Sequence, residues 1–189
     1  MGRPRSYDRD DVLERAMDLF WKKGFEGAHL QELVEVTGLN RFSLYNEFGG
    51  KEGLFHEALA RYLDQSRLAY GQTLGAEPLG VDNIRRYFES IHYSRGYHGC
   101  LMINTLTEKH IVTSAAFRRA RGYAQDVERL FLDNVRAAQE RGEIDDARDP
   151  AALASLLAAL DQGLAVYGIV EPSNAKKDAL VSQLDSLLV

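Results

Sequence analysis

Proline is rare in this chain, and its positions limit what the rest of the chain can form. Four prolines occur in 189 residues, at positions 4, 78, 150 and 172. Each lies where a helix is expected to begin or end, so long stretches lack the residue that breaks helices. Within those stretches apolar residues recur at helical spacing, and the alternation typical of β-strands is scarce. The sequence therefore predicts an all-α fold.

Glycine and capping residues divide these stretches into about nine helices. They are expected near residues 8–24, 30–37, 41–48, 51–70, 81–94, 101–110, 114–141, 150–169 and 173–188. The segment Gly71–Gly80 holds three glycines and a proline and is expected to be a loop between two functional parts. The predicted domains are residues 1–50, joined by a connecting helix over 51–70 to a second domain over 71–189.

Charge and apolar content exclude some classes of protein. The formal net charge is −5, so a DNA-binding role would need Lys and Arg gathered locally. The longest apolar stretch, Ala151–Leu160, ends at Asp161 and falls short of the ~20 residues of a membrane span. The N-terminus carries no apolar segment typical of a secretory signal. With a single cysteine and no membrane partner expected, we predict a cytoplasmic protein.

Residues 30–48 have the dimensions of a helix-turn-helix, with a short helix, a turn at Gly38 and a second helix capped by Asn40. In such a unit the second helix enters the major groove and the first helix braces it. The bracing apolar residues are Leu30, Leu33, Val34, Leu39, Leu44 and Phe48. The residues left to face outward or sideways are Arg41, Phe42, Ser43, Tyr45, Asn46 and Glu47.

The run from Gly38 to Phe55, GLNRFSLYNEFGGKEGLF, resembles the signature of TetR-type transcription regulators. The approach to it, Ala16–Phe20 followed by Lys23-Gly24-Phe25, is similar as well. The resemblance is specific over about residues 8–59, and beyond them it rests on helix number and order alone. It implies an N-terminal helix-turn-helix DNA-binding domain followed by a helical ligand-binding and dimerisation domain.

The resemblance also implies DNA-contacting roles for matching positions. Arg41 and Ser43 would contact phosphates or base edges, and Tyr45 would reach a phosphate through its hydroxyl. Lys51 would bind a phosphate at a helix N-terminus, a position that favours anions. The N-terminal arginines would enter the minor groove or follow the backbone. The predicted DNA-binding residues are Arg3, Arg5, His29, Asn40, Arg41, Phe42, Ser43, Tyr45, Asn46 and Lys51.

Some of these positions have a second interpretation. Tyr45 also suits packing on the fourth helix, and Phe42 fits packing better than a base contact. Lys51 opposes the helix dipole, which points to an anionic partner rather than a solvated cation. Ala28 and His29 stand where the family often has Ser or Thr, and of the two only His29 offers a donor.

The local charge balance is a further question for this segment. Residues 1–50 hold seven Lys and Arg against nine Asp and Glu. Among the acids, Glu47 either repels phosphate or accepts from a cytosine amino group. DNA binding by this segment therefore requires the basic groups to lie on one face.

The middle helices mix aromatic and polar side chains in a way that suits a small-molecule cavity and also suits a plain core. The predicted ligand-binding residues are Tyr87, Phe88, Ile91, His92, Cys100, Met102, Asn104, Glu108, Phe117 and Tyr123. The Gly99–Leu101 segment resembles one through which some TetR-type regulators are thought to sense electrophiles or oxidants. A buried inert thiol is the simpler interpretation of Cys100. No His and Cys spacing matches a zinc site, so we expect neither metal nor cofactor.

The last two predicted helices are apolar around much of their circumference, which a single small domain cannot easily bury. They predict a homodimer, as the resemblance also implies, with some of the same residues serving the core of each chain. The predicted dimerisation residues are Leu153, Leu156, Leu160, Leu164, Tyr167, Leu180, Leu184 and Leu187.

These expectations combine into a ligand-responsive regulator, in this family usually a repressor, with a double-stranded DNA operator, a second copy and an unidentified small-molecule effector as partners. An enzyme is disfavoured because no nucleophile elbow, phosphate loop or metal motif occurs. The alternative is a helical dimer that binds a protein partner and has lost DNA binding. The acidic balance and the departure at Ala28 and His29 are its support.

Overall fold

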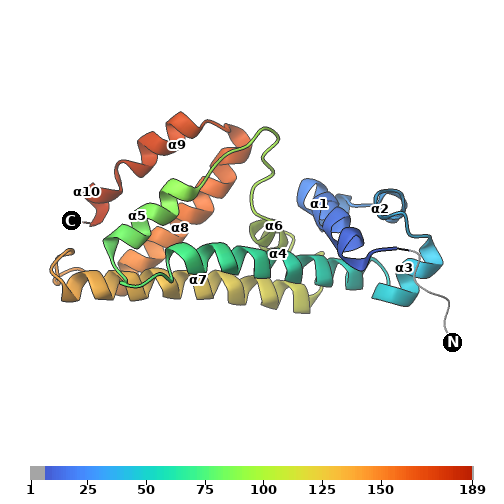
Figure 1. The fold of residues 1–189 in the computed structure, drawn as a ribbon, viewed down its shortest axis with the longest axis horizontal. Coiled ribbons are helices and arrows are strands. Elements are labelled where there is room, and N and C mark those ends of the chain that lie inside the picture. The colour runs from blue at the N-terminus through green and yellow to red at the C-terminus, as the bar shows by residue number, and fades with distance from the viewer. Residues whose placement is uncertain (1–6, 189) are drawn as a thin grey trace. The chain divides into compact units, whose positions relative to one another are not determined.

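The fold is all-α, as the sequence predicts. The computed structural model describes residues 7–188, and within that range it holds helices and loops but no strand (Figure 1). Its elements are α1 (Arg9–Gly27), α2 (Leu30–Thr37), α3 (Arg41–Phe48), α4 (Lys51–Thr73), α5 (Val81–Ser90), α6 (Leu101–Thr107), α7 (Ser114–Glu140), α8 (Pro150–Val170), α9 (Asn174–Val181) and α10 (Leu184–Leu188).

Most helices begin where their capping residues predict. Asp8 accepts from the backbone N–H of Asp10 at 2.9 Å, and Asp149 caps α8 by accepting from Ala151 N at 2.9 Å. Two helices are shorter than expected, because α5 ends at Ser90 and α6 at Thr107. The predicted final helix is divided into α9 and α10 around Ser182.

The chain forms two compact units. One comprises residues 1–65 and 100–121, and the other comprises residues 66–99 and 122–189. Helices α4 and α7 each contribute to both units. This division is by packing, and it places α6 in the first unit. The functional division into residues 1–50 and 71–189 stays a prediction.

The first unit is built around aromatic side chains from α1 and α4. The rings of Phe20 and Phe25 each meet the ring of Phe55 edge-on, with centroids 4.9 Å apart in both pairs. Helix α1 packs against both α2 and α6. Gly24 breaks α1 with φ +72°, a left-handed value that glycine adopts without steric cost, and one more turn follows it.

The second unit has its own aromatic core. Phe88 on α5 stacks on Phe131 of α7 with centroids 5.6 Å apart, and Tyr87 meets both rings edge-on. Asn134, fully buried on α7, donates to Leu74 O at 2.8 Å and accepts from Gly80 N at 2.9 Å. These bonds hold both ends of the loop that leads from α4 to α5.

Helix α8 forms over nearly the predicted range, but its apolar character continues beyond Asp161 to Val170, further than the sequence analysis allowed. By length and composition it is apolar enough to cross a membrane, the one helix of the described residues with that property, and a third of its apolar window is buried in this chain. Its exposed apolar side chains are Leu156, Val166, Ile169 and Val170. Exposed apolar patches are typical of interaction surfaces.

Candidate DNA-binding surface

The helix-turn-helix forms where the sequence predicts it. Helix α2 ends at Gly38, whose φ of +70° reverses the chain, and α3 begins after Asn40. The side chain of Asn40 accepts from Ser43 N at 2.8 Å, which satisfies one of the free N–H groups at the start of α3. Asn40 therefore acts as a helix cap in the free protein. At α2, Glu32 accepts from the backbone N–H of His29 at 3.3 Å.

The bracing face of the motif is largely as predicted. Leu33, Leu39, Leu44 and Phe48 are buried, whereas Leu30 and Val34 are half-buried. Thr37 closes the turn, because its Oγ1 donates to Leu33 O at 2.5 Å and accepts from Leu39 N at 3.3 Å. The brace fixes the face that α3 turns outward.

The outward face of α3 carries Arg41, Phe42, Tyr45 and Asn46, all exposed, beside the half-buried Ser43 and Glu47. Phe42 is 75% exposed and Tyr45 is 57% exposed. The packing interpretation of Phe42 is therefore wrong, since Phe42 lies outside the core of this chain. An exposed aromatic ring between polar neighbours instead suits contact with a partner.

Arg41 differs from the other cations of this segment. Among the Lys and Arg residues between positions 7 and 51, Arg41 is the one whose side chain makes no hydrogen bond, ion pair or ring contact with the described residues. The cations that do have partners are Arg9 with Glu57, Arg15 with Asp11, Lys22 with Asp18, Lys23 with Glu32, and Lys51 with the carbonyl of Glu26. Asp8 caps α1, and Asp10 and Glu14 pair with Arg61, so six of the nine acids of residues 1–50 are engaged away from α3. This leaves a basic group on the exposed face of α3.

Tyr45 is held by the turn that follows α3. A Cβ added to Gly50 would lie 3.0 Å from the Tyr45 ring, so the ring rests against the backbone there. Tyr45 therefore has one edge packed against this turn and more than half of the residue exposed, and its contact with DNA stays a prediction.

Lys51 has an intramolecular role that sequence reasoning missed. Its Nζ donates to Glu26 O at 3.3 Å, at the end of α1, and lies 4.6 Å from the centroid of the Phe25 ring. Burial lowers the pKa of the Lys51 ammonium, although the Glu108 and Glu26 carboxylates oppose that effect. The unfavourable position at the start of α4 therefore has an explanation within the chain.

Two predicted ligand-binding residues fasten α6 to α1. Glu108 accepts from the backbone N–H of Phe25 at 2.8 Å and of Glu26 at 3.1 Å, immediately after the break at Gly24. Asn104, one turn earlier, donates to Trp21 O at 3.5 Å. The first unit also contains Met102, buried, and Phe117 and Cys100, both half-buried. The Cys100 thiol lies 3.3 Å from the hydroxyl of Tyr62.

The other predicted ligand-binding residues belong to the second unit. Tyr87, Phe88 and Tyr123 are buried, Ile91 is half-buried and His92 is exposed. The ten predicted residues are thus divided between two compact units. The sequence reasoning missed Tyr70 and Asp161, which lie with Tyr87. Asp161 had a visible signal, since it interrupts the apolar run of α8.

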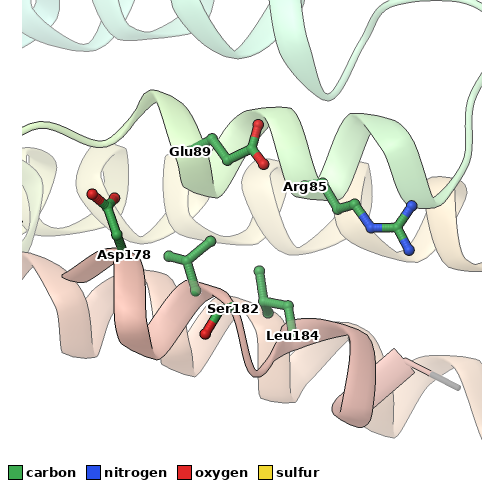
Figure 2. Close-up of a pocket in the computed structure, with 6 residues that line it drawn as sticks. Arg85, Glu89, Asp178, Ser182 and Leu184 are labelled. Carbon is green, nitrogen blue, oxygen red and sulfur yellow. The ribbon is translucent and has the colours of Figure 1, made fainter. Parts of the chain in front are cut away.

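The second unit has grooves that are lined in part by residues of α5. One, of about 320 Å³, lies between α5 and the α9–α10 segment; Figure 2 shows Arg85 and Glu89 facing Asp178, Ser182 and Leu184 there. Its charges are balanced locally, because Arg85 pairs with Asp82 at 3.0 Å and the buried Lys177 pairs with Asp178 at 2.5 Å. This groove is charged on both sides and differs from the mostly apolar cavity expected for an effector.

The predicted dimerisation residues fall into two groups. Leu153, Leu164 and Leu184 are buried within this chain, so they belong to its own core and are unavailable to a partner. Leu156, Leu180 and Leu187 are exposed, and Leu160 and Tyr167 are half-buried. Arg3 and Arg5 lie outside the described residues.

Comparison with known proteins places both halves of the chain in one family. The sequence model of bacterial regulatory proteins of the TetR family matches residues 12–58, and that of the tetracycline repressor-like C-terminal domain matches residues 80–181. The transcriptional repressor ComR of Escherichia coli K12 is 35% identical over 170 residues, which cover 87% of this chain and 81% of ComR. YezE, an uncharacterised regulator of Bacillus subtilis 168, is 30% identical over 83% of this chain and 84% of its own length.

A solved structure agrees with these matches. The TetR-family regulator CifR, with three cysteines substituted and bound to a 26-bp operator DNA, superposes with a TM-score of 0.87 at 31% identity, covering all of both chains. The two family models together span most of the sequence, and the relatives match over most of their own lengths. The chain therefore belongs to the TetR family of bacterial regulatory proteins.

Proposed function

We propose that this chain is a DNA-binding transcriptional repressor that recognises its operator through the exposed face of α3. The observation that carries the proposal is Arg41, a cation without a partner among the described residues, beside the exposed rings of Phe42 and Tyr45. A helix in the major groove presents its N-terminal side chains to base edges and phosphates, and Arg41 stands at the first position of α3. The likeness to CifR, whose structure holds operator DNA, supports the same use of this helix.

Within this surface the residues have different proposed roles. Arg41 and Tyr45 contact phosphates or base edges, and Phe42 lies against sugar or a thymine methyl group. Asn46 and Ser43 supply further polar contacts, and Asn40 acts through the cap that orients the start of α3. Lys51 positions the end of α1 through Glu26 O and adds positive potential, so it combines a structural role with the predicted phosphate contact.

Operator binding is tested by fluorescence anisotropy with the chain's own upstream DNA at two or more salt concentrations. Binding should weaken with salt, and Arg41→Ala should reduce the salt slope by about one. Tyr45→Phe, which removes only the hydroxyl, should weaken binding by about threefold to tenfold if that hydroxyl donates to phosphate. Arg136→Ala, an exposed arginine on α7, is the matched control and should bind as the wild type does.

The alternative function, a helical dimer with a protein partner and no DNA, predicts a different result. Neither the upstream DNA nor selection from random sequences would then yield a specific site for the wild type. Loss of binding in Arg136→Ala equal to that in Arg41→Ala would also contradict recognition by α3, because it would indicate a general charge effect.

The proposal includes a homodimer formed through the exposed apolar side chains of α8 and α9–α10. Leu156, Ile169 and Leu180 are 46%, 50% and 44% exposed, and such side chains are costly to leave in water. A dimer accounts for the apolar length of α8 without a membrane. It would place two recognition helices about 34–36 Å apart, which suits a pseudo-palindromic operator.

The proposal also includes release from DNA by a small-molecule effector that favours a conformer unsuited to the operator. A coupling of about 1–3 kcal/mol between the two sites is sufficient. Linkage makes this coupling reciprocal, so operator DNA must weaken effector binding by the same factor. Equal effector affinity with and without operator would contradict this part of the proposal.

A further inference from the structure

Helix α8 carries a carboxylate on its core-facing side. Leu157, Leu164 and Gly168 are buried on that side, and Asp161 stands among them, four residues after Leu157 and three before Leu164. Asp161 is half-buried as a residue, and its carboxyl group is desolvated enough to raise its pKa to about 6. Carboxylates in such positions are normally paired with a cation, so this one requires an explanation.

The partner of Asp161 is a tyrosine rather than a cation. The Tyr87 hydroxyl lies 2.5 Å from Asp161 Oδ1 and 3.2 Å from the Tyr70 hydroxyl. Tyr87 has one proton to give, and the shorter contact with the carboxylate takes it, so Tyr70 donates to the Tyr87 oxygen. In the described part of the chain no Lys or Arg pairs with Asp161, and the nearby Arg67 is engaged with Asp126 at 3.4 Å.

The two tyrosines border a groove between the end of α4 and α5. The groove has a volume of about 200 Å³ and is lined by Ser66, Ala69, Tyr70, Thr73, Tyr87 and Ser90. The rings of Tyr70 and Tyr87 are stacked with centroids 5.1 Å apart. The stacked rings cover one face of each other and Tyr87 is 7% exposed, so the half-buried Tyr70 is the more accessible ring. The other lining residues add hydroxyl groups, and none of them is charged.

These features together are the chemistry of a cation site. An aromatic face attracts a cation through its quadrupole, and aromatic cages recognise quaternary ammonium groups in this way. The uncompensated charge of Asp161 adds a longer-range attraction in a partly desolvated setting. A neutral ligand would leave that charge without a partner, and an anion would be repelled by it.

We propose that the groove bordered by Tyr70 and Tyr87 binds a small organic ammonium ion, held by the ring of Tyr70 and by the negative charge of Asp161. The volume of about 200 Å³ accommodates a head group of the size of choline. The proposal names the chemical class of effector, and it rests on the proposed function for the link between this site and release of DNA.

The first test compares two probes of the same shape. Choline and 3,3-dimethylbutan-1-ol differ in the charged nitrogen, which in the alcohol is replaced by carbon. Each probe is titrated into the full-length protein by isothermal titration calorimetry at about pH 8, where Asp161 is ionised. Choline should bind about tenfold or more tightly than the alcohol. Equal binding of the two, or no choline binding up to about 10 mM, overturns the proposal.

Variants then assign the site. Asp161→Asn keeps the shape and removes the charge, and Tyr70→Leu removes one aromatic face; each should weaken choline binding by about tenfold. Asp146→Asn, an exposed acid in the same unit, is the matched control and should bind choline as the wild type does. Thermal unfolding of each variant verifies that it is folded. Choline binding retained in folded Asp161→Asn and Tyr70→Leu contradicts the assigned site.

Operator binding by the wild type, measured without choline, separates the two proposals. Specific operator binding together with absent choline binding overturns the ammonium site and leaves the DNA-binding proposal intact. Choline binding that depends on Asp161 but leaves operator affinity unchanged supports the site and contradicts its role as the effector site. Choline binding without any specific operator supports the site, while the proposed repressor function fails.

Discussion

At the scale of single residues, the ionised carboxylate of Asp161 lowers the stability of the fold. Burial disfavours its ionised form, and the hydrogen bond from Tyr87 compensates only in part. The difference between a pKa of 3.8 and one of about 6 corresponds to about 3 kcal/mol of destabilisation when the group is ionised. Residues kept at such a cost are more often functional than structural.

The pH dependence of stability tests this cost. Because the folded pKa is raised, the wild type should lose stability as the pH rises from about 4 through 6, with the full loss present at pH 8. Asp161→Asn has no group to ionise, so it should be more stable than the wild type at pH 8 by roughly 1–3 kcal/mol. The advantage should shrink at about pH 4. Chemical denaturation at both values measures it, and an advantage independent of pH would contradict the assigned cause.

A pair of glycines on α4 gives a second prediction at this scale. A Cβ at Gly53 would lie 1.6 Å from the Phe48 carbonyl oxygen, whereas a Cβ at Gly71 would meet nothing within 4 Å. Gly53→Ala should therefore force α3 and α4 apart and cost about 1–3 kcal/mol. Gly71→Ala should stabilise by about 0.5–1 kcal/mol through its higher helix propensity. Similar unfolding temperatures for the two variants would contradict the close approach at Gly53.

At the scale of elements, α1 is held from two sides after its break at Gly24. Glu108, at the end of α6, accepts from the backbone N–H groups of Phe25 and Glu26, and Lys51, at the start of α4, donates to the Glu26 carbonyl. Three helices distant in sequence thus meet at one turn of backbone. A carboxylate at these N–H groups satisfies donors that the helix itself leaves free.

Removal of this anchor should loosen the first unit. Glu108→Ala leaves the two N–H groups to solvent and should lower the free energy of unfolding by roughly 1–2 kcal/mol. Operator affinity should fall with it, because α1 supports the helix-turn-helix through α2. Glu35→Ala, an exposed acid on α2, should leave the unfolding free energy within about 0.5 kcal/mol. If Glu108→Ala leaves the free energy of unfolding unchanged, the hydrogen bonds of Glu108 after Gly24 make no net contribution to stability.

At the scale of the whole molecule, the exposed apolar face of α8 is the surface that we propose for the homodimer. Leu156 and Ile169 are half exposed, and each would be buried in a homodimer. The double substitution Leu156→Arg and Ile169→Arg should yield folded monomers in size-exclusion chromatography with light scattering. Operator affinity should then fall by about a hundredfold or more, since one recognition helix would bind alone.

The control for this experiment is Ile111→Arg, which changes an apolar side chain of similar exposure, 45%, in the first unit. This variant should elute as the wild type does. A wild type that is already monomeric would contradict the dimer directly. Recovery of the wild type with membranes would instead show that the apolar length of α8 serves another surface.

The sequence by itself determined the helices and the position of the helix-turn-helix, because proline, glycine and capping residues act within a few positions of themselves. Asn40 and Asp149 cap the helices they were expected to cap. Only the tertiary structure decided which residues pair across long separations in sequence, such as Glu108 with the turn after Gly24 and Asp161 with Tyr87. It also decided which leucines of α8 are buried in the core and which are exposed, and that Phe42 is exposed. Burial of a side chain depends on which elements pack against it, and local periodicity does not contain that information.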